Sequence, residues 1–131
     1  MTDNKIYSVF LVDDDDVFLD MLNQTFSEIP NIKTHLFQSG EQCLENLHLN
    51  PDVIVLDYFF DKAGEDALNG METLKRIIRE KNDAKVIMLT AQEEGNKVYE
   101  FIHNGARDYV IKDLDAFDNV IEAVDGILEE N

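Results

Sequence analysis

Runs of consecutive apolar residues divide the sequence at regular intervals. Four apolar side chains stand together at residues 9–12, 53–56 and 86–89, a pattern typical of short strands buried on both faces. The first of these strands is expected to begin at Tyr7. Weaker strand patterns occur at residues 33–37, where polar and apolar residues alternate, and at 109–111. The pattern therefore predicts five short strands.

Apolar residues in the intervening stretches recur with the helical spacing of three or four positions. Asp15 or Asp16 is placed to cap the first helix. Ser39 opens the second helix, with Gln42 completing a capping-box pattern, and Gly105 follows the fourth helix as its C′ residue. The residues predicted to face the core are Val17, Phe18, Met21, Leu22 and Phe26; Cys43, Leu44 and Leu47; Met71, Leu74, Ile77 and Ile78; Val98, Phe101 and Ile102; and Phe117, Val120, Ile121, Val124, Ile127 and Leu128.

Strands and helices alternate strictly along the chain. This order predicts an α/β fold, a doubly wound five-stranded parallel sheet with helices on both faces and right-handed crossovers. The length of 131 residues suits a single domain over residues 1–131. Ligands of such sheets bind outside the carboxyl ends of the strands, so the residues at those ends are the first candidates for function.

Polar residues follow four of the five predicted strands. Asp13 and Asp14 come directly after the first strand, and Asp57 follows the third. Thr90 and Lys112 end the fourth and fifth strands. Because the strands are parallel, these side chains are expected to meet at one edge of the sheet.

Three converging carboxylates require a cation, and hard oxygen ligands suit Mg²⁺ or Mn²⁺. A lysine at the same edge supplies a fixed positive charge for a phosphoryl group, and a threonine hydroxyl can hydrogen-bond one of its oxygens. The sequence has no G-x-x-x-x-G-K-[ST] loop, so nothing indicates a bound nucleotide. An aspartate with a cation and a lysine beside it is instead equipped to become phosphorylated itself.

Composition narrows the classes of partner. The net charge is −17, from 28 acidic and 11 basic residues, which opposes direct binding to nucleic acid or to anionic lipid. No apolar run approaches the length of a membrane span. Cys43 is the only cysteine, which favours a reducing compartment and hence a cytoplasmic location.

In the order and spacing of its motifs, the chain resembles the receiver domain of response regulators in two-component signalling. The motifs lie at residues 12–14, 53–57, 88–91 and 105–112, and the resemblance extends from Tyr7 to Leu128. It implies a flavodoxin-like sheet with strand order 2-1-3-4-5. It also implies a phosphoprotein of a phosphorelay that is not a turnover enzyme, and whose partner is a histidine kinase or a histidine phosphotransfer protein.

The resemblance assigns the chemistry to particular residues. Asp57 would be the phosphoacceptor, with Lys112 pairing with the phosphoryl group. Asp14 would ligate Mg²⁺ directly, together with Asp57 and the backbone carbonyl of Phe59. Asp13 would act mainly through a metal-bound water.

The resemblance also implies a switch. Thr90 would move to bond the phosphoryl group and Tyr109 would rotate inward, altering the face near the last two strand–helix units. Phe59 and Gln92 would tune the access of the water that removes the phosphoryl group. The chain departs from the family where Asp113 replaces the usual proline after Lys112, so that this peptide bond is expected to be trans.

Two other interpretations are open. The run Asp13-Asp-Asp-Asp-Val17 also fits the D-x-D-x-[TV] motif of haloacid-dehalogenase-type phosphatases, in which Asp13 would be the nucleophile and Asp15 the general acid. A pseudo-receiver, regulated by contacts alone, is the other. The chain is expected to be either a stand-alone receiver or one domain of a longer regulator.

Overall fold

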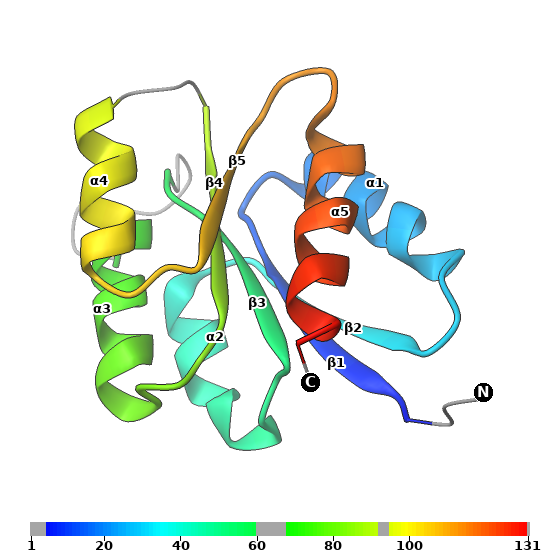
Figure 1. The fold of residues 1–131 in the computed structure, drawn as a ribbon, viewed down its shortest axis with the longest axis horizontal. Coiled ribbons are helices and arrows are strands. Elements are labelled where there is room, and N and C mark those ends of the chain that lie inside the picture. Colours follow the sequence, from blue (N-terminus) through cyan, green and yellow to red (C-terminus); the bar gives the residue numbers. More distant parts are fainter. Residues whose placement is uncertain (1–4, 60–67, 92–94, 131) are drawn as a thin grey trace.

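A central sheet of five parallel strands organises the chain, and the computed structural model describes it over residues 5–59, 68–91 and 95–130 (Figure 1). The strands are β1 (Tyr7–Val12), β2 (Ile32–Phe37), β3 (Val53–Asp57), β4 (Val86–Thr90) and β5 (Asp108–Ile111). Their order in the sheet is β2-β1-β3-β4-β5, and every pair is parallel. The predicted fold class and strand order are confirmed.

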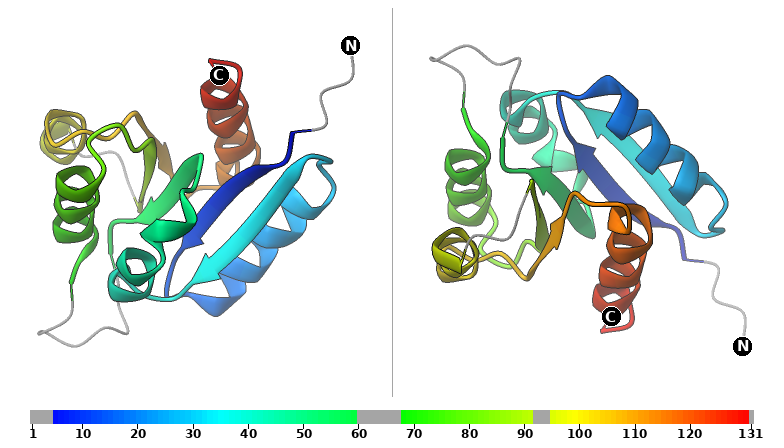
Figure 2. Two further views of the ribbon diagram at one scale, coloured as in Figure 1. Left: turned by 90° about the horizontal axis from the view of Figure 1, so that it is seen from below. Right: turned by 90° about the horizontal axis from the view of Figure 1, so that it is seen from above.

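The helices divide between the two faces of the sheet. They are α1 (Asp16–Ser27), α2 (Gly40–Glu45), the short 3₁₀ helix η1 (Leu47–Leu49), α3 (Gly70–Glu80), α4 (Gly95–His103) and α5 (Ala116–Leu128). α1 and α5 cover one face, while α2, α3 and α4 cover the other (Figure 2). Each face has its own apolar core, because successive residues of a buried strand point to opposite sides.

The register of the strands brings their carboxyl ends level. Val12 lies beside Phe37 on one side and Leu56 on the other. Asp57 pairs with Leu89, and Thr90 pairs with Ile111. The residues that follow β1 and β5 therefore emerge at the same edge as Asp57 and Thr90.

Two of the predicted helix stripes are partly wrong. In α1 the side chains of Val17 and Met21 are 69% and 48% exposed, and Leu19 is buried instead. The sheet-facing residues of α1 are Leu19, Leu22 and Phe26, a second series with helical spacing within the same apolar segment. In α4, Ile102 is 48% exposed because the buried Phe101 fills the space against the sheet.

The helix ends follow the predicted capping with one difference. Asp15 caps α1 by accepting from the backbone N–H groups of Val17 and Phe18. Ser39 Oγ accepts from Gln42 N, but the Gln42 side chain accepts from the backbone N–H of Gln38 rather than that of Ser39, so the predicted box is not reciprocal.

Gly105 has φ +106°, as expected for a C′ residue. No helix in the described ranges is long and apolar enough to cross a membrane.

The contact between α2 and α3 gives a direct test of this packing. A Cβ at Gly40 would lie 2.0 Å from Thr73 Oγ1, so Gly40→Ala is expected to lower the free energy of unfolding by about 1–3 kcal/mol. Adding Thr73→Ala should recover part of the loss, as measured by urea unfolding.

Gly126, in α5, is the matched control because a Cβ there would meet nothing within 4 Å. Gly126→Ala should stabilise the protein by about 0.5–1 kcal/mol, since alanine has the higher helix propensity. Equal effects of the two glycine substitutions would contradict the described α2–α3 contact.

Candidate functional site

Three buried carboxylates meet at the carboxyl edge of the sheet. Asp13 and Asp14 follow β1, and Asp57 ends β3. One oxygen from each lies within 4.8 Å of the others. The residues are 1%, 9% and 3% exposed, respectively, so water screens their mutual repulsion poorly.

Local backbone interactions separate the four consecutive acids into two functions. The backbone N–H of Asp13 donates to the carbonyl of Phe37 at 3.0 Å, which extends the β1–β2 pairing by one residue. Asp13 Oδ1 in turn accepts from the backbone N–H of Asp15 at 2.9 Å. Asp15 and Asp16 then begin α1 on the exposed side. The first two acids therefore face the site, and the next two belong to the helix start.

The side chain of Lys112 reaches into the acidic cluster from the end of β5. Its Nζ lies 2.7 Å from Asp13 Oδ2 and 3.4 Å from Asp57 Oδ1. The backbone N–H of Lys112 donates to the carbonyl of Thr90 at 2.7 Å, so the loop leaves the sheet directly beside β4. No peptide bond in the described residues is cis, including that between Lys112 and Asp113.

Burial and like charge shift the titration of these groups. Burial, followed by the charge of Asp13, raises the pKa of Asp57 to about 8. Burial likewise raises the pKa of Asp13, against the opposing effect of Lys112. Burial alone would lower the pKa of Lys112, but its hydrogen bond to Asp13 and the charge of Asp57 outweigh that effect and raise it. The Lys112 ammonium therefore stays charged, whereas simultaneous ionisation of the buried acids is opposed.

The donor set of the cluster fits a hard divalent cation. All three candidate groups are carboxylates, the ligand type that Mg²⁺ and Mn²⁺ prefer. When all three are ionised, the Lys112 ammonium offsets one of their three negative charges, and a divalent cation would neutralise the rest.

The remaining predicted site residues are placed less uniformly. Thr90 is 6% exposed at the end of β4, level with the cluster. Tyr109 is half-buried in β5 beside Met88. It packs against the apolar core on the face of the sheet that α2, α3 and α4 cover. The Phe59 side chain is 61% exposed, while its backbone hydrogen bond to Asp57 lowers the pKa of that acid. Gln92 lies outside the described residues.

A close backbone approach beside Asp57 was not predicted as part of the site. A Cβ at Gly70 would lie 2.4 Å from the carbonyl oxygen of Asp57 and from the Cα of Tyr58. The Gly70 N–H also donates to the carbonyl of Tyr58 at 3.0 Å. This contact across the loop could not be read from local spacing in the sequence.

The structure weighs against Asp15 as a general acid. Its carboxylate is exposed and accepts from two backbone N–H groups at the start of α1. Both oxygens of Asp13 also have close neighbours, the Asp15 N–H and the Lys112 ammonium. Asp57 likewise has the Lys112 ammonium and a backbone hydrogen bond from Phe59 beside it, so close neighbours alone do not separate the two acids.

Comparison with known proteins gives a consistent match. The family described as the response regulator receiver domain matches residues 9–125. The transcriptional regulatory protein DegU of Brevibacillus brevis is 29% identical over 95% of this chain and 50% of its own length. The chemotaxis protein CheY of Listeria monocytogenes is 32% identical over 59% of this chain and 60% of its own length. The chain thus spans about half the length of the first of these relatives.

Solved structures show the same fold. The receiver domain of the Francisella response regulator 1452 has a TM-score of 0.81 at 28% identity, covering 95% of this chain and 98% of that one. The BeF3-activated DrrB receiver domain has a TM-score of 0.78 at 26% identity, with the same coverage.

The buried acids give a pH-dependent prediction for the metal-free protein. The pKa of Asp57 is about 8 in the folded state, against an ordinary value of 3.8, so folding favours its protonated form. The contribution of Asp57 to the free energy of unfolding therefore falls as the pH rises from 3.8 to about 8. Asp57→Asn should be more stable than the natural sequence by a few kcal/mol at pH 8 (on the order of 1.4 per unit of pKa shift) but similar at pH 4.

Chemical unfolding with EDTA at a series of pH values measures this difference. Added Mg²⁺ should reduce it, because a cation at the carboxylates favours the ionised form. If the stability difference between Asp57→Asn and the natural sequence does not change with pH, the pKa of Asp57 is not raised by folding.

Proposed function

The chain belongs to the response regulator receiver family, and we propose that its Asp57 accepts a phosphoryl group from a phosphohistidine in a step that requires Mg²⁺ or Mn²⁺. The observation that carries this proposal is the contact of buried Asp57 with Lys112 beside two further buried acids. Asp57 lies beside both further acids that could hold a cation and an ammonium, the two elements that phosphoryl transfer to a carboxylate needs.

In the proposed step a carboxylate oxygen of Asp57 forms a bond to phosphorus while the phosphorus–nitrogen bond of phosphohistidine breaks, and the imidazole keeps the electron pair. Asp13, Asp14 and Asp57, with the backbone carbonyl of Phe59, would hold the cation, Asp13 mainly through water. The cation supplies neutralisation of the phosphoryl oxygens. Lys112 would neutralise a further oxygen, so catalysis would rest on positioning and charge.

The proposed switch joins β4 to β5. Thr90 would bond the phosphoryl group from its buried place at the end of β4, and Tyr109 would rotate inward from its half-buried place in β5. Because the backbone N–H of Lys112 donates to the carbonyl of Thr90, a shift of Thr90 would also move the start of the loop between β5 and α5. The face affected would be that of α4, β5 and α5.

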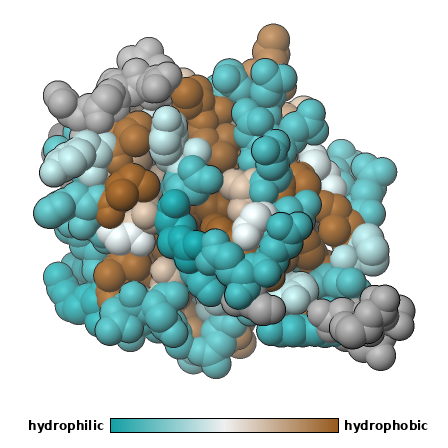
Figure 3. Space-filling model, in the orientation of Figure 1, coloured by the Kyte–Doolittle hydropathy of each residue, from teal (hydrophilic) through white to brown (hydrophobic). Residues whose placement is uncertain are grey.

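The α4–β5–α5 face has the mixed character of a reversible contact surface. Hydrophilic residues cover much of the face seen in Figure 3, with apolar residues between them. Tyr99 and Ile102 of α4 are 71% and 48% exposed. We propose that a histidine kinase or histidine phosphotransfer protein supplies the phosphoryl group and that this face then contacts a downstream protein.

Several features of the proposal rest on the family alone. Phe59 and Gln92 would set the lifetime of the phosphoryl group, and the protein would be phosphorylated and dephosphorylated at Asp57 without acting as a turnover enzyme. Residues 1–131 as a single receiver domain in the cytoplasm, without direct binding to nucleic acid or membrane, stay predictions. No observation favours the phosphatase or the phosphorylation-independent alternative over this proposal.

Labelling with acetyl phosphate tests the proposed reaction. Intact-mass spectrometry with Mg²⁺ should show addition of one phosphoryl group, and peptide mapping should place it on Asp57. Asp57→Asn should abolish this labelling, because an amide is not a nucleophile for phosphorus.

Asp16→Asn is the matched control, since it removes the same charge from the exposed end of the acidic run. It should label normally. Turnover of a phosphomonoester that is lost in Asp13→Asn would instead support the phosphatase interpretation, and absence of any labelling in the natural sequence would support the pseudo-receiver.

A further inference from the structure

The Lys112 ammonium has an aromatic neighbour as well as its two carboxylates. Its Nζ lies 4.4 Å from the centroid of the Phe18 ring. Asp13 and Asp57 lie 2.7 and 3.4 Å from the same atom. The lysine side chain is only 20% exposed, so the attraction between the cation and the ring is partly shielded from water.

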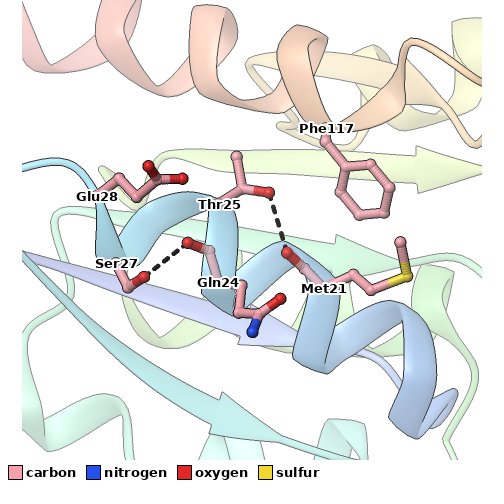
Figure 4. A pocket seen from close by; sticks show the side chains of 6 residues that line it. All are labelled: Met21, Gln24, Thr25, Ser27, Glu28 and Phe117. Atoms are coloured by element: carbon pink, nitrogen blue, oxygen red, sulfur yellow. Dashed lines mark hydrogen bonds between the residues drawn. The ribbon is translucent and has the colours of Figure 1, made fainter.

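A second ring holds Phe18 in this place. Phe18, in α1, stacks on Phe117 of α5 with 5.1 Å between the ring centroids and 27° between the planes. Both rings also pack against the α1–α5 core. Figure 4 shows the Phe117 ring beside α1, where it lines a groove with Met21, Gln24, Thr25, Ser27 and Glu28. The stack therefore joins two helices beside the loop that carries Lys112.

The backbone alone does not fix the ammonium. Hydrogen bonds hold Lys112 N to Thr90 O and Asp115 N to the Asp113 side chain, which set the course of the loop. The lysine side chain still has four rotatable bonds and two acceptors at unequal distances. Even with Phe18 in place the ammonium lies nearer to Asp13 than to Asp57, so these two contacts leave Nζ room to move away from Asp57.

We infer that Phe18 is a positioning residue, which holds the Lys112 ammonium where it can serve Asp57, and that Phe117 supports Phe18 from α5. This inference rests on the proposed phosphorylation of Asp57. The ring covers one side of the ammonium and limits the positions that Nζ can take. Phe18 touches Lys112 and not the reacting atoms, so it acts on the reaction through the lysine.

The contact itself is testable without phosphorylation. Ring currents of Phe18 should displace the ε-methylene proton resonances of Lys112 upfield in the NMR spectrum of the unphosphorylated protein. Phe18→Leu should move these resonances toward their ordinary position, and Phe18→Tyr should preserve them. Phe117→Leu should give a smaller change in the same direction.

The effect on the reaction is measured in the same variants. With saturating Mg²⁺, Phe18→Leu should slow labelling of Asp57 by acetyl phosphate about fivefold, as expected for loss of one cation–π contact. Phe18→Tyr should restore the rate, and Mg²⁺ affinity should stay within about twofold throughout because the carboxylates are untouched.

Val17→Ala is the control, since Val17 adjoins Phe18 in α1 and is 69% exposed. It should leave both the resonances and the rate unchanged. Unchanged Lys112 resonances in Phe18→Leu would overturn the inference, and so would an unchanged labelling rate. If Phe18→Leu does not fold, Phe18→Met and Phe117→Leu decide the question by the same two readouts.

The experiments distinguish failure of the proposed phosphorylation from failure of the positioning role of Phe18. If the phosphorylation fails, the natural sequence would not label at all, whereas the resonances of Lys112 would still report whether Phe18 lies against its ammonium. Labelling at Asp57 with no effect of Phe18→Leu would leave the proposed function standing and would refute the positioning role.

Discussion

The Lys112 ammonium faces three buried carboxylates, and the structure around it is arranged to keep them together. Burial raises the pKa of Asp57 to about 8. In this buried setting, ionising all three acids disfavours the folded state unless a cation is bound. The same stress makes the cluster suited to bind a divalent ion and to accept a phosphoryl group, since both bring compensating interactions.

Packing of the parallel sheet offsets this electrostatic cost, because its central strands are buried on both faces. The described residues of β3 and β4 are all buried, and their apolar side chains enter both cores. The strand register then fixes the level at which Asp13, Asp57 and Thr90 leave the sheet. Gly70 permits the chain to return within contact distance of Asp57. Packing in the two apolar cores thus holds the acids together at the carboxyl edge of the sheet, although their mutual repulsion is unfavourable.

Much of this arrangement could be predicted from the sequence. Consecutive apolar residues located β1, β3 and β4, and the acids and the lysine at strand ends indicated one shared edge. The helix faces were less certain, because α1 contains two overlapping apolar series and only packing against the sheet selects Leu19 over Val17. Contacts between distant segments, such as Lys112 with Phe18, have no local signature in the sequence.

The location of a phosphoryl analogue tests the central claim most directly. A crystal structure of the protein with Mg²⁺ and beryllofluoride should show beryllium bonded to a carboxylate oxygen of Asp57. The metal should lie among the three acids, and Lys112 should contact a fluorine from the other side. Beryllium bonded to Asp13, or a metal bound away from Asp14 and Asp57, would contradict the account.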